Sequence, residues 1–500
     1  MELKTKIYPI KADMPIVVMN EEDAKDLGVY VSSRVVVEYK GREITAIVDT
    51  TKIFVREGEI GLFDDVRRML NVREKAKVHV MEAKRPSSVS LIKKKLNGYT
   101  LNEKEIRDII QDIVDNNLSN IELSAFVVGG YVNGYNMDEI TALTTAMVET
   151  GQQIDFGNNI VDKHCIGGVA GNRTTMLVVP IIAAAGLTIP KTSSRAITSP
   201  AGTADTMEVL APVEFDIDKL KKIVSRTNAC ITWGGAVNLA PADDKIIRVE
   251  YPLSLDAEGH MLASVMAKKR SVGSDFLLID IPVGKGAKVD DNVRANELAG
   301  KFIELGSRLG ISVECLITDG SSPIGSGIGP ALEARDVLLC LKNKGPVDLI
   351  DKSLDLAGNM LELAGRVVKG KGRSVAEHIL NSGRADKKMR EIIAAQGGDP
   401  EITVDDIKIE KKGATVSSEH KGRVRHIDNG MISRIARTAG APRSRGSGIY
   451  MHVNVGDCVN VGDPLFTIYS STNSRLEDAV RLSETLSPIR VGSIISDVIR

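Results

Sequence analysis

Residues 162–175 read DKHCIGGVAGNRTT and place three glycines between a Lys-His pair and two threonines. The run that follows, MLVVPIIAAAG at residues 176–186, is apolar on every face, which predicts a buried helix with Gly186 as its stop signal. A glycine loop that enters a helix N-terminus offers unpaired backbone N–H groups and the positive end of the helix dipole. This stretch therefore predicts an anion site, most simply a phosphate site. The alternative is an ordinary loop that caps a core helix.

Side chains of the same loop favour the anion site. Lys163 would add a full positive charge, and Thr174 and Thr175 would add hydroxyl donors. Cys165 is expected to be a small loop residue and not a nucleophile, because no base other than His164 is evident nearby in the sequence.

A second stretch, SSRAITSPAGTADTME at residues 193–208, is dense in anion and hydroxyl donors, although its Ser-Pro pair would also fit a solvated turn. The two stretches together resemble the nucleoside phosphorylase family that includes thymidine and pyrimidine-nucleoside phosphorylases. In that family the first motif reads Lys-His-Ser-Thr-Gly-Gly-Val-Gly-Asp. The second reads Ser-Gly-Arg-Gly-Leu and, after two variable residues, Thr-Gly-Gly-Thr-x-Asp. The positions of this chain that keep the motifs are Lys163, His164, Gly167, Gly168, Val169, Ser193, Arg195, Gly202, Thr203 and Asp205.

The departures from these motifs are also informative. Cys165 and Ile166 stand where the family has Ser-Thr, Ala196 stands where it has Gly, and Pro200 and Ala201 stand where it has Thr-Gly. With these substitutions the chain resembles one branch of the family, the archaeal AMP phosphorylases. The family resemblance covers about residues 85–500, and a further N-terminal barrel is peculiar to that branch.

The composition is ordinary for a globular protein, with 43% hydrophobic and 26% charged residues. A chain of 500 residues is too long for one core, so about two to four domains are expected. The net charge of −1 gives no global field toward nucleic acid or a membrane. No apolar run reaches the roughly 18 residues of a membrane span, and residues 1–6 lack the apolar core of a signal peptide. Five scattered cysteines fit a reducing cytosol and predict neither a disulfide framework nor a zinc site, so a cytoplasmic location is expected.

The first half of the chain predicts two domains. Residues 1–84 are β-rich, with a hairpin at 33–48, a last strand at 77–80 and short helices at 21–27 and 63–70, which predicts a small β-barrel; the double-psi type is one candidate. No catalytic constellation is visible there, so a structural role is favoured, with assembly and substrate entry as alternatives. Residues 85–154 predict a helical domain, with a capping box at Asn102 and Glu105 and amphipathic segments at 106–114 and 137–149. Part of 240–272 is expected to complete it.

The second half predicts a large α/β domain and a smaller α+β domain. In residues 155–410 strand-like runs such as 276–281 and 312–317 alternate with helices such as 292–309, which is typical of a mostly parallel sheet. The Gly-Ser-Gly at 325–327 lacks the flanking pattern of a dinucleotide loop. Residues 411–500 include Gly-Asp turns at 454–466 that resemble the barrel-sandwich hybrid of biotinyl and lipoyl carriers, but no lysine stands between two such turns, so a carrier role is excluded. The predicted fold class is thus multidomain α/β, with a barrel-sandwich-like C-terminal domain.

The family resemblance implies roles for particular residues. Lys163, Ser193 and Thr203 match phosphate ligands, with Thr174 or Thr175 as further donors, and His164 matches an active-site histidine, although a core histidine is the usual alternative. Arg248, Ser264 and Lys268 match positions that grip the base in pyrimidine enzymes. The other nucleotide contacts that the resemblance implies are Gly168, Ser194, Arg195, Ala196, Ile197, Thr198, Ser199 and Thr203.

Two further residues distinguish the nucleotide-using branch. Asp256, in the interval between Arg248 and Ser264, matches the proposed proton donor of that branch; an ordinary turn aspartate is the alternative. A carboxylic acid can protonate a departing adenine at N7 when burial raises the pKa of the acid toward the working pH. Lys288 follows a predicted strand and a glycine turn, and with donors from 194–199 it could bind a 5′-phosphate; a solvated lysine is the alternative.

The resemblance predicts phosphorolysis of nucleoside 5′-monophosphates, chiefly AMP, to the free base and ribose 1,5-bisphosphate, with CMP and UMP as further substrates. It implies no metal or organic cofactor, with phosphate as co-substrate, and a homodimer or larger homo-oligomer. One alternative is a pyrimidine-nucleoside phosphorylase, which Ala196, Pro200 and Ala201 disfavour. Another is a phosphoribosyltransferase of related fold, for which the acidic magnesium motif is not evident. A third is a non-catalytic assembly scaffold, which the intact Lys163, Thr203, Asp256 and Lys288 disfavour.

Overall fold

The structure is a computed structural model that describes residues 1–12, 14–196 and 199–492. The chain divides into two compact units, of which the first comprises Met1–Gly151 and Ala240–Ser264 and the second comprises Gln152–Leu239 and Val265–Arg500. The first unit thus takes in a segment from the middle of the chain. The finer domain boundaries at residues 84, 154 and 410 stay predictions. Within the described ranges, no helix combines the length and the apolar character needed to cross a membrane.

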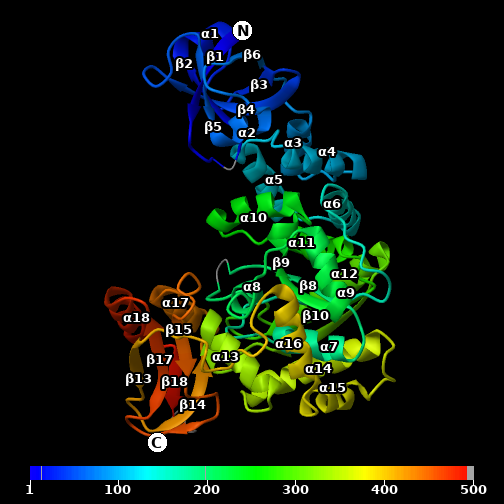
Figure 1. The fold of residues 1–500 in the computed structure, drawn as a ribbon, viewed down its shortest axis with the longest axis vertical. Helices are drawn as coiled ribbons and strands as arrows, with labels where there is room; N and C mark the ends of the chain where they lie inside the picture. Colours follow the sequence, from blue (N-terminus) through cyan, green and yellow to red (C-terminus); the bar gives the residue numbers. More distant parts are fainter. Residues whose placement is uncertain (13, 197–198, 493–500) are drawn as a thin grey trace, which may run out of the picture. The chain divides into compact units, whose positions relative to one another are not determined.

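The first unit begins with a closed six-stranded barrel, drawn in blue in Figure 1, whose strand order is β1-β5-β2-β4-β3-β6. Two neighbouring pairs, β1 with β5 and β2 with β4, run parallel, and the other pairs run antiparallel. Alternate side chains such as Val35, Val37 and Val48 are fully buried because successive residues of a strand point to opposite faces. The predicted small barrel with short helices is confirmed. Its elements are β1 (Glu2–Tyr8), β2 (Ile16–Asn20), α1 (Glu21–Leu27), β3 (Arg34–Tyr39), β4 (Arg42–Thr51), β5 (Glu59–Phe63), α2 (Asp64–Leu70) and β6 (Lys77–Glu82).

Helices make up the rest of the first unit: α3 (Ser88–Leu96), α4 (Glu103–Val114), α5 (Asn120–Asn133), α6 (Met137–Glu149), α10 (Pro241–Leu253) and the start of α11 (Glu258–Ser271). The predicted capping box of α4 is confirmed, since the Asn102 side chain accepts from the Glu105 N–H and the Glu105 side chain accepts from the Asn102 N–H. Such a box satisfies backbone donors that a helix N-terminus would leave unpaired. A buried ion pair between Lys95 and Glu139, 2.8 Å long, joins α3 to α6.

Five parallel strands form the centre of the second unit: β7 (Val161–Cys165), β8 (Ile189–Ser193), β9 (Ala229–Trp233), β10 (Phe276–Val283) and β11 (Ser312–Asp319). β10 pairs with both β7 and β11, and β8 pairs with β9, all in parallel. A parallel bridge between Ile160 and Thr188 joins β7 to β8. The strand neighbours therefore follow the order β11-β10-β7-β8-β9. The chain runs outward from β7 to β9, then returns to the other side of β7 at β10, so the topology reverses between β7 and β10.

Helices pack around these strands, and the predicted helix after the glycine loop is confirmed as α7 (Thr175–Ala184). Its residues Thr175–Ala183 are all buried because α7 packs between α14 (Val347–Leu363), α16 (Arg384–Gln396) and the strands. Gly186 has a φ of +89° just beyond its end, as the stop signal requires. The remaining helices of this part are α8 (Thr203–Met207), α9 (Ile217–Thr227), α12 (Asn292–Leu309), α13 (Pro330–Leu341) and α15 (Gly372–Asn381), with a 3₁₀ turn, η1 (Gly234–Val237).

The described residues of the last part of the second unit, up to Gly492, form two sheets and two helices, which agrees with the predicted α+β class. The sheets have the orders β12-β15-β17-β13 and β16-β14-β18. β12 comes from the α/β part of the chain and pairs with β15, so it ties the C-terminal part to that region. The elements are β12 (Gly327–Ile328), β13 (Lys412–Ser417), β14 (Gly422–Ile427), α17 (Asn429–Ala439), β15 (Gly448–Met451), β16 (Cys458–Val459), β17 (Pro464–Ser470), α18 (Asn473–Leu486) and β18 (Ile489–Gly492).

Candidate active site

The loops that follow β7 and β10 pack directly against each other. A Cβ atom added to Gly168, in the first loop, would lie 2.4 Å from the backbone nitrogen of Lys288, in the second. Such a distance leaves no room for a side chain, so glycine is required at this contact. In open α/β sheets, ligands bind at the carboxyl ends of the strands where the topology reverses. The predicted glycine loop and Lys288 therefore lie at the edge of the sheet where open α/β folds commonly bind ligands.

Lys163 lies on β7 with its ammonium group at the N-terminal end of α7. Its side chain is 1% exposed, and Nζ donates to Thr174 Oγ1 at 2.9 Å and to Thr175 Oγ1 at 3.4 Å. Burial lowers the pKa of Lys163, and the carboxylate of Asp280 partly opposes that shift. An ammonium group, two hydroxyls and a helix N-terminus thus lie together, which is the donor set that a phosphate binds. The structure brings together these three residues of the predicted phosphate site.

The backbone of the glycine loop adopts conformations that favour glycine. Gly167 and Gly171 have φ values of +97° and +73°, in the left-handed region. A Cβ on Gly171 would lie 2.2 Å from the carbonyl oxygen of Ile324. Asn172 then accepts from Thr174 Oγ1 at 3.0 Å through its own Oδ1. The contact with Asn172 fixes the Thr174 hydroxyl beside Lys163.

The second predicted stretch lies between β8 and α8. Ser193 is the last residue of β8, and Thr203 is the first residue of α8. Asp205 Oδ2 accepts from the backbone N–H of Ala196 at 2.7 Å and from that of Gly202 at 2.8 Å. One carboxylate therefore holds both ends of the loop between the two predicted phosphate ligands.

Arg173 joins the two stretches, a contact that the sequence did not reveal. It donates to the Ala201 carbonyl and, at 3.2 Å, to Thr206 Oγ1, and it forms a buried ion pair with Glu333 on α13. Thr206 Oγ1 in turn donates to Glu333 Oε2 at 2.7 Å. The separation of Arg173 and Glu333 by 160 positions explains why no local pattern signalled the pair.

Arg195, a predicted nucleotide contact, is held by three carboxylates. Its guanidinium lies 2.8 Å from both carboxylate oxygens of Glu208, 2.7 Å from Glu214 and 3.3 Å from Asp205. It also lies over the ring of Trp233, 5.0 Å from the ring centroid. Hydrogen bonds to Glu208 raise the pKa of Arg195 further above its ordinary value. Arg195 thus holds the loop in place, and direct contact with a nucleotide stays a prediction.

His164 is half-buried at the end of β7. Burial and the positive charges of Lys269, Lys191, Lys163 and Lys268 lower the pKa of His164 well below its usual range. The imidazole is therefore neutral at neutral pH, and it can donate or accept a hydrogen bond without adding positive charge.

Cys165, the next residue on β7, has a thiol whose pKa burial raises to about 11. A thiol in that state is a poor nucleophile at neutral pH. This property agrees with the prediction that Cys165 is not a nucleophile, but the prediction that it lies in the loop is wrong, because Cys165 is the last residue of β7.

A buried ion cluster surrounds Lys163, and sequence reasoning missed it. Its contacts are Lys269–Asp162 at 2.7 Å, Lys191–Asp162 at 3.7 Å, Lys352–Asp280 at 3.2 Å and Lys163–Asp280 at 3.9 Å. Four lysines share two carboxylates, which leaves an excess of positive charge next to the predicted phosphate site. Burial and the charge of Lys269 lower the pKa of Lys191 to about 7. The available sequence signal was the charged pair Asp162 and Lys163, which directly follows the apolar residues Ile160 and Val161.

The predicted base-binding residues Arg248 and Ser264, and the predicted proton donor Asp256, belong to the first unit. Arg248 is exposed on α10, Ser264 is half-buried on α11, and Asp256 is exposed in the turn between these helices. Lys268 lies four residues beyond Ser264, one turn further along α11.

The turn that carries Asp256 is fixed by a buried histidine. His260 Nε2 lies 2.9 Å from Tyr135 Oη, and His260 Nδ1 lies 3.0 Å from Glu250 Oε1. Since Glu250 is on α10 and His260 is on α11, the contact holds both ends of the turn. Sequence reasoning did not single out this group.

The remaining predicted nucleotide contacts differ in exposure. Ser194 and Lys288 are exposed, and Ser199 is half-buried with its hydroxyl donating to the Ala201 carbonyl at 2.9 Å. Ile197 and Thr198 lie outside the described residues.

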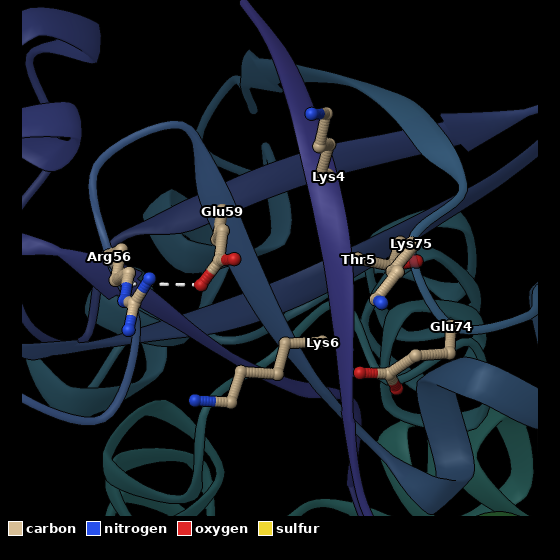
Figure 2. A pocket seen from close by; sticks show the side chains of 7 residues that line it. All are labelled: Lys4, Thr5, Lys6, Arg56, Glu59, Glu74 and Lys75. Atoms are coloured by element: carbon tan, nitrogen blue, oxygen red, sulfur yellow. Dashed lines mark hydrogen bonds between the residues drawn. The ribbon is translucent and has the colours of Figure 1, made fainter.

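A cavity of about 520 Å³ lies on the barrel, and none of the predicted site residues lines it. Its lining residues are Lys4, Thr5, Lys6, Arg56, Glu59, Glu74 and Lys75. Figure 2 shows Lys6, Arg56 and Glu59 on one side of β1, and Lys75 and Glu74 on the other. The cationic groups therefore do not converge on one point, and two carboxylates interrupt them. Among the described residues, no group of three or more His, Cys, Asp or Glu side chains could hold a metal ion.

Three family models match the chain. Two describe domains of glycosyl transferases and one describes a domain of pyrimidine nucleoside phosphorylase, so the chain is of the glycosyl transferase class. The helical bundle domain of a glycosyl transferase family matches residues 89–151, and the a/b domain of a glycosyl transferase family matches residues 157–386. The C-terminal domain of pyrimidine nucleoside phosphorylase matches residues 423–490. A crystal structure of anthranilate phosphoribosyltransferase from Thermus thermophilus shares the fold, with a TM-score of 0.53 and 19% identity over 61% of this chain and 98% of that one.

Curated relatives narrow the glycosyl transferase class to one family. The chain is 47% identical to AMP phosphorylase 1 of Archaeoglobus fulgidus, over 100% of this chain and 99% of the relative. It is 49% identical to the AMP phosphorylase of Pyrococcus furiosus, over 99% of each chain. The chain belongs to the AMP phosphorylase family. The resemblance read from the two glycine-containing stretches is thereby confirmed.

Proposed function

We propose that this protein phosphorolyses nucleoside 5′-monophosphates, chiefly AMP, and converts AMP and inorganic phosphate to adenine and ribose 1,5-bisphosphate. CMP and UMP are further substrates in this proposal. One structural observation supports it: the donor set around Lys163 lies on β7 and at the start of α7, and the loop that joins these two elements packs directly against the loop of Lys288. Two loops with cationic side chains suit a substrate pair that brings two phosphate groups.

The first loop holds the attacking phosphate. Lys163 and the hydroxyls of Thr174 and Thr175 bind its oxygens, and Ser193 and Thr203 add donors from β8 and α8. One phosphate oxygen forms a bond to C1′ of the ribose while the bond from C1′ to the base nitrogen breaks. The excess positive charge of the buried ion cluster favours the bound dianion.

The second loop holds the 5′-phosphate of the nucleotide. Lys288 supplies a cation there, and Ser194 supplies a hydroxyl from the loop after β8. A nucleoside lacks this phosphate, so it forgoes the charge-assisted contacts that Lys288 provides. Preference for nucleotides over nucleosides follows from this difference.

Departure of the base requires a proton. Asp256 is the proposed donor to adenine N7, and Arg248, Ser264 and Lys268 hold the base. A neutral His164 contributes a hydrogen bond beside the phosphate and avoids a further positive charge there. General acid assistance of this kind accelerates such a step by about 100- to 10,000-fold.

A paired assay tests the function. The protein is incubated with phosphate and AMP, or with phosphate and adenosine, uridine or thymidine, and the released base is followed by chromatography. We expect phosphate-dependent release of adenine from AMP and scarcely any base from the nucleosides. Release from uridine or thymidine alone would make the protein a pyrimidine-nucleoside phosphorylase, and release from none would favour the scaffold interpretation.

A further inference from the structure

Arg445, in the segment between α17 and β15, contacts the end of α8. Its Nη2 lies 2.8 Å from Glu208 Oε2, and its Nη1 donates to the backbone carbonyl of Glu208 at 3.2 Å. The Arg445 guanidinium thus binds both the side chain and the main chain of Glu208. Since Glu208 is the C-cap of α8, the contact fixes the far end of the helix that begins at Thr203.

The Glu208 carboxylate binds Arg195 as well as Arg445. Both of its oxygens bind Arg195 at 2.8 Å, and Oε2 also binds Arg445. Arg195 in turn lies over Trp233 and is the residue before Ala196, whose N–H binds Asp205. The C-terminal part of the chain is therefore linked to the loop that contains the proposed phosphate and nucleotide ligands.

We propose that Arg445 is a positioning residue: through Glu208 it holds Arg195 and α8 in the arrangement that binds the anionic substrates. The consequence for catalysis rests on the proposed function, whereas the consequence for Arg195 does not. Space for a different arrangement exists, because a cavity of about 240 Å³ lies beside this network. Its lining residues are Arg195, Asp205, Glu208, Pro442, Arg443 and Arg445.

The contact matters more for position than for stability. The Arg445 side chain is 55% exposed and the Glu208 side chain is 22% exposed. An ion pair at such a surface contributes about 1 kcal/mol or less to the free energy of unfolding, whereas misplacing a binding group by about 1 Å can cost about 100-fold in rate. Loss of Arg445 should therefore leave the protein folded and disturb the loop.

Trp233 provides a readout that does not depend on activity. It is the single tryptophan of the chain, and the Arg195 guanidinium lies 5.0 Å from the centroid of its ring. We expect Arg445→Met to shift the emission maximum of Trp233 to longer wavelength and to increase its quenching by acrylamide. Arg443→Met is the matched control, because Arg443 lines the same cavity and is a surface arginine two positions away. It should leave the fluorescence unchanged.

Kinetics provide the second readout. Arg445→Met should lower kcat/KM for AMP about tenfold, mainly by raising the KM for AMP and for phosphate, and Arg445→Lys should restore part of the loss because an ammonium keeps one contact. Combining Arg445→Met with Glu208→Gln should add little to the larger single effect.

Identical fluorescence and kinetics for Arg445→Met and Arg443→Met would overturn the proposal. If the unsubstituted protein fails to phosphorolyse AMP, the proposed function falls and the Trp233 comparison still decides the role of Arg445.

Discussion

The backbone of Gly168 packs against the backbone nitrogen of Lys288, so closely that a Cβ atom on Gly168 would lie 2.4 Å from that nitrogen. The contact joins the loop after β7 to the loop after β10, at the reversal of the sheet topology. It sets the spacing between the two loops to which we assign the two phosphate groups. The geometry of both proposed phosphate sites depends on this spacing.

Gly168→Ala should lower kcat/KM for AMP by about 100-fold or more, because the added methyl group pushes the two loops apart. Gly167→Ala is a matched control, since Gly167 has a similar φ of +97° but no atom within 4 Å of an added Cβ. The Gly167→Ala variant introduces the strain of a positive φ but no clash with a neighbouring loop, so it should lose much less activity. Equal losses in steady-state kinetics would mean that the contact with Lys288 does not set the geometry of the site.

Lys288→Met should weaken the use of AMP far more than the use of adenosine, because only the nucleotide brings a 5′-phosphate to the second loop. The lost charge-assisted contact should raise the KM for AMP by roughly 10- to 100-fold. Lys285→Met, in the same exposed turn, should leave both substrates nearly unaffected. Parallel losses on nucleotide and nucleoside would count against the proposed role.

Asp256→Asn should lower kcat for AMP by about 100-fold with little change in KM, as expected for loss of a proton donor. Glu258→Gln, two positions away at the start of α11, is the control and should retain most of the activity. A change confined to KM would instead assign Asp256 to substrate binding.

Lys191→Met should change how stability depends on pH. The pKa of Lys191 is about 7 in the folded protein and about 10.4 in an unfolded chain. Between these values the unfolded state holds a proton that the folded state has released, so the contribution of Lys191 to stability rises with pH across this window. Below pH 7 the full cost of burying the charge is present.

Unfolding by urea, followed through Trp233 fluorescence, measures this effect. The stability of the unsubstituted protein relative to Lys191→Met should rise between pH 7 and pH 9 by at most about 1.4 kcal/mol per pH unit. Lys222→Met, at an exposed position on α9, should run parallel to the unsubstituted protein. Parallel curves for Lys191→Met as well would show that Lys191 does not titrate in this range.

Local sequence signals predicted much of the fold. The capping box of α4 involves residues three positions apart, and α12 has the predicted bounds Asn292–Leu309. The buried helix after the glycine loop was predictable because its apolar run is complete and Gly186 ends it. In each case the determining interactions lie within one turn or one loop.

The parts that sequence reasoning missed depend on partners far apart in the chain. Asp162 and Lys269 are separated by 107 positions, and Glu208 and Arg445 by 237. α8 was not predicted because it is only five residues long and starts in a stretch whose composition is typical of a turn. The carboxylate partners of Arg195 are only 10 to 19 positions away, but they come together through the fold of a loop and not through a regular helix or strand spacing, so this network could not be predicted either.

The most direct test of the central claim is ³¹P NMR of the protein with AMP and inorganic phosphate. The proposed reaction predicts that both phosphorus signals decline together while two signals of equal intensity grow, one from an anomeric phosphate and one from a 5′-phosphate on the same ribose. Release of adenine with a constant inorganic phosphate signal would instead give ribose 5-phosphate and establish hydrolysis. That result would contradict phosphorolysis and the assignment of Lys163, Thr174 and Thr175 to an attacking phosphate.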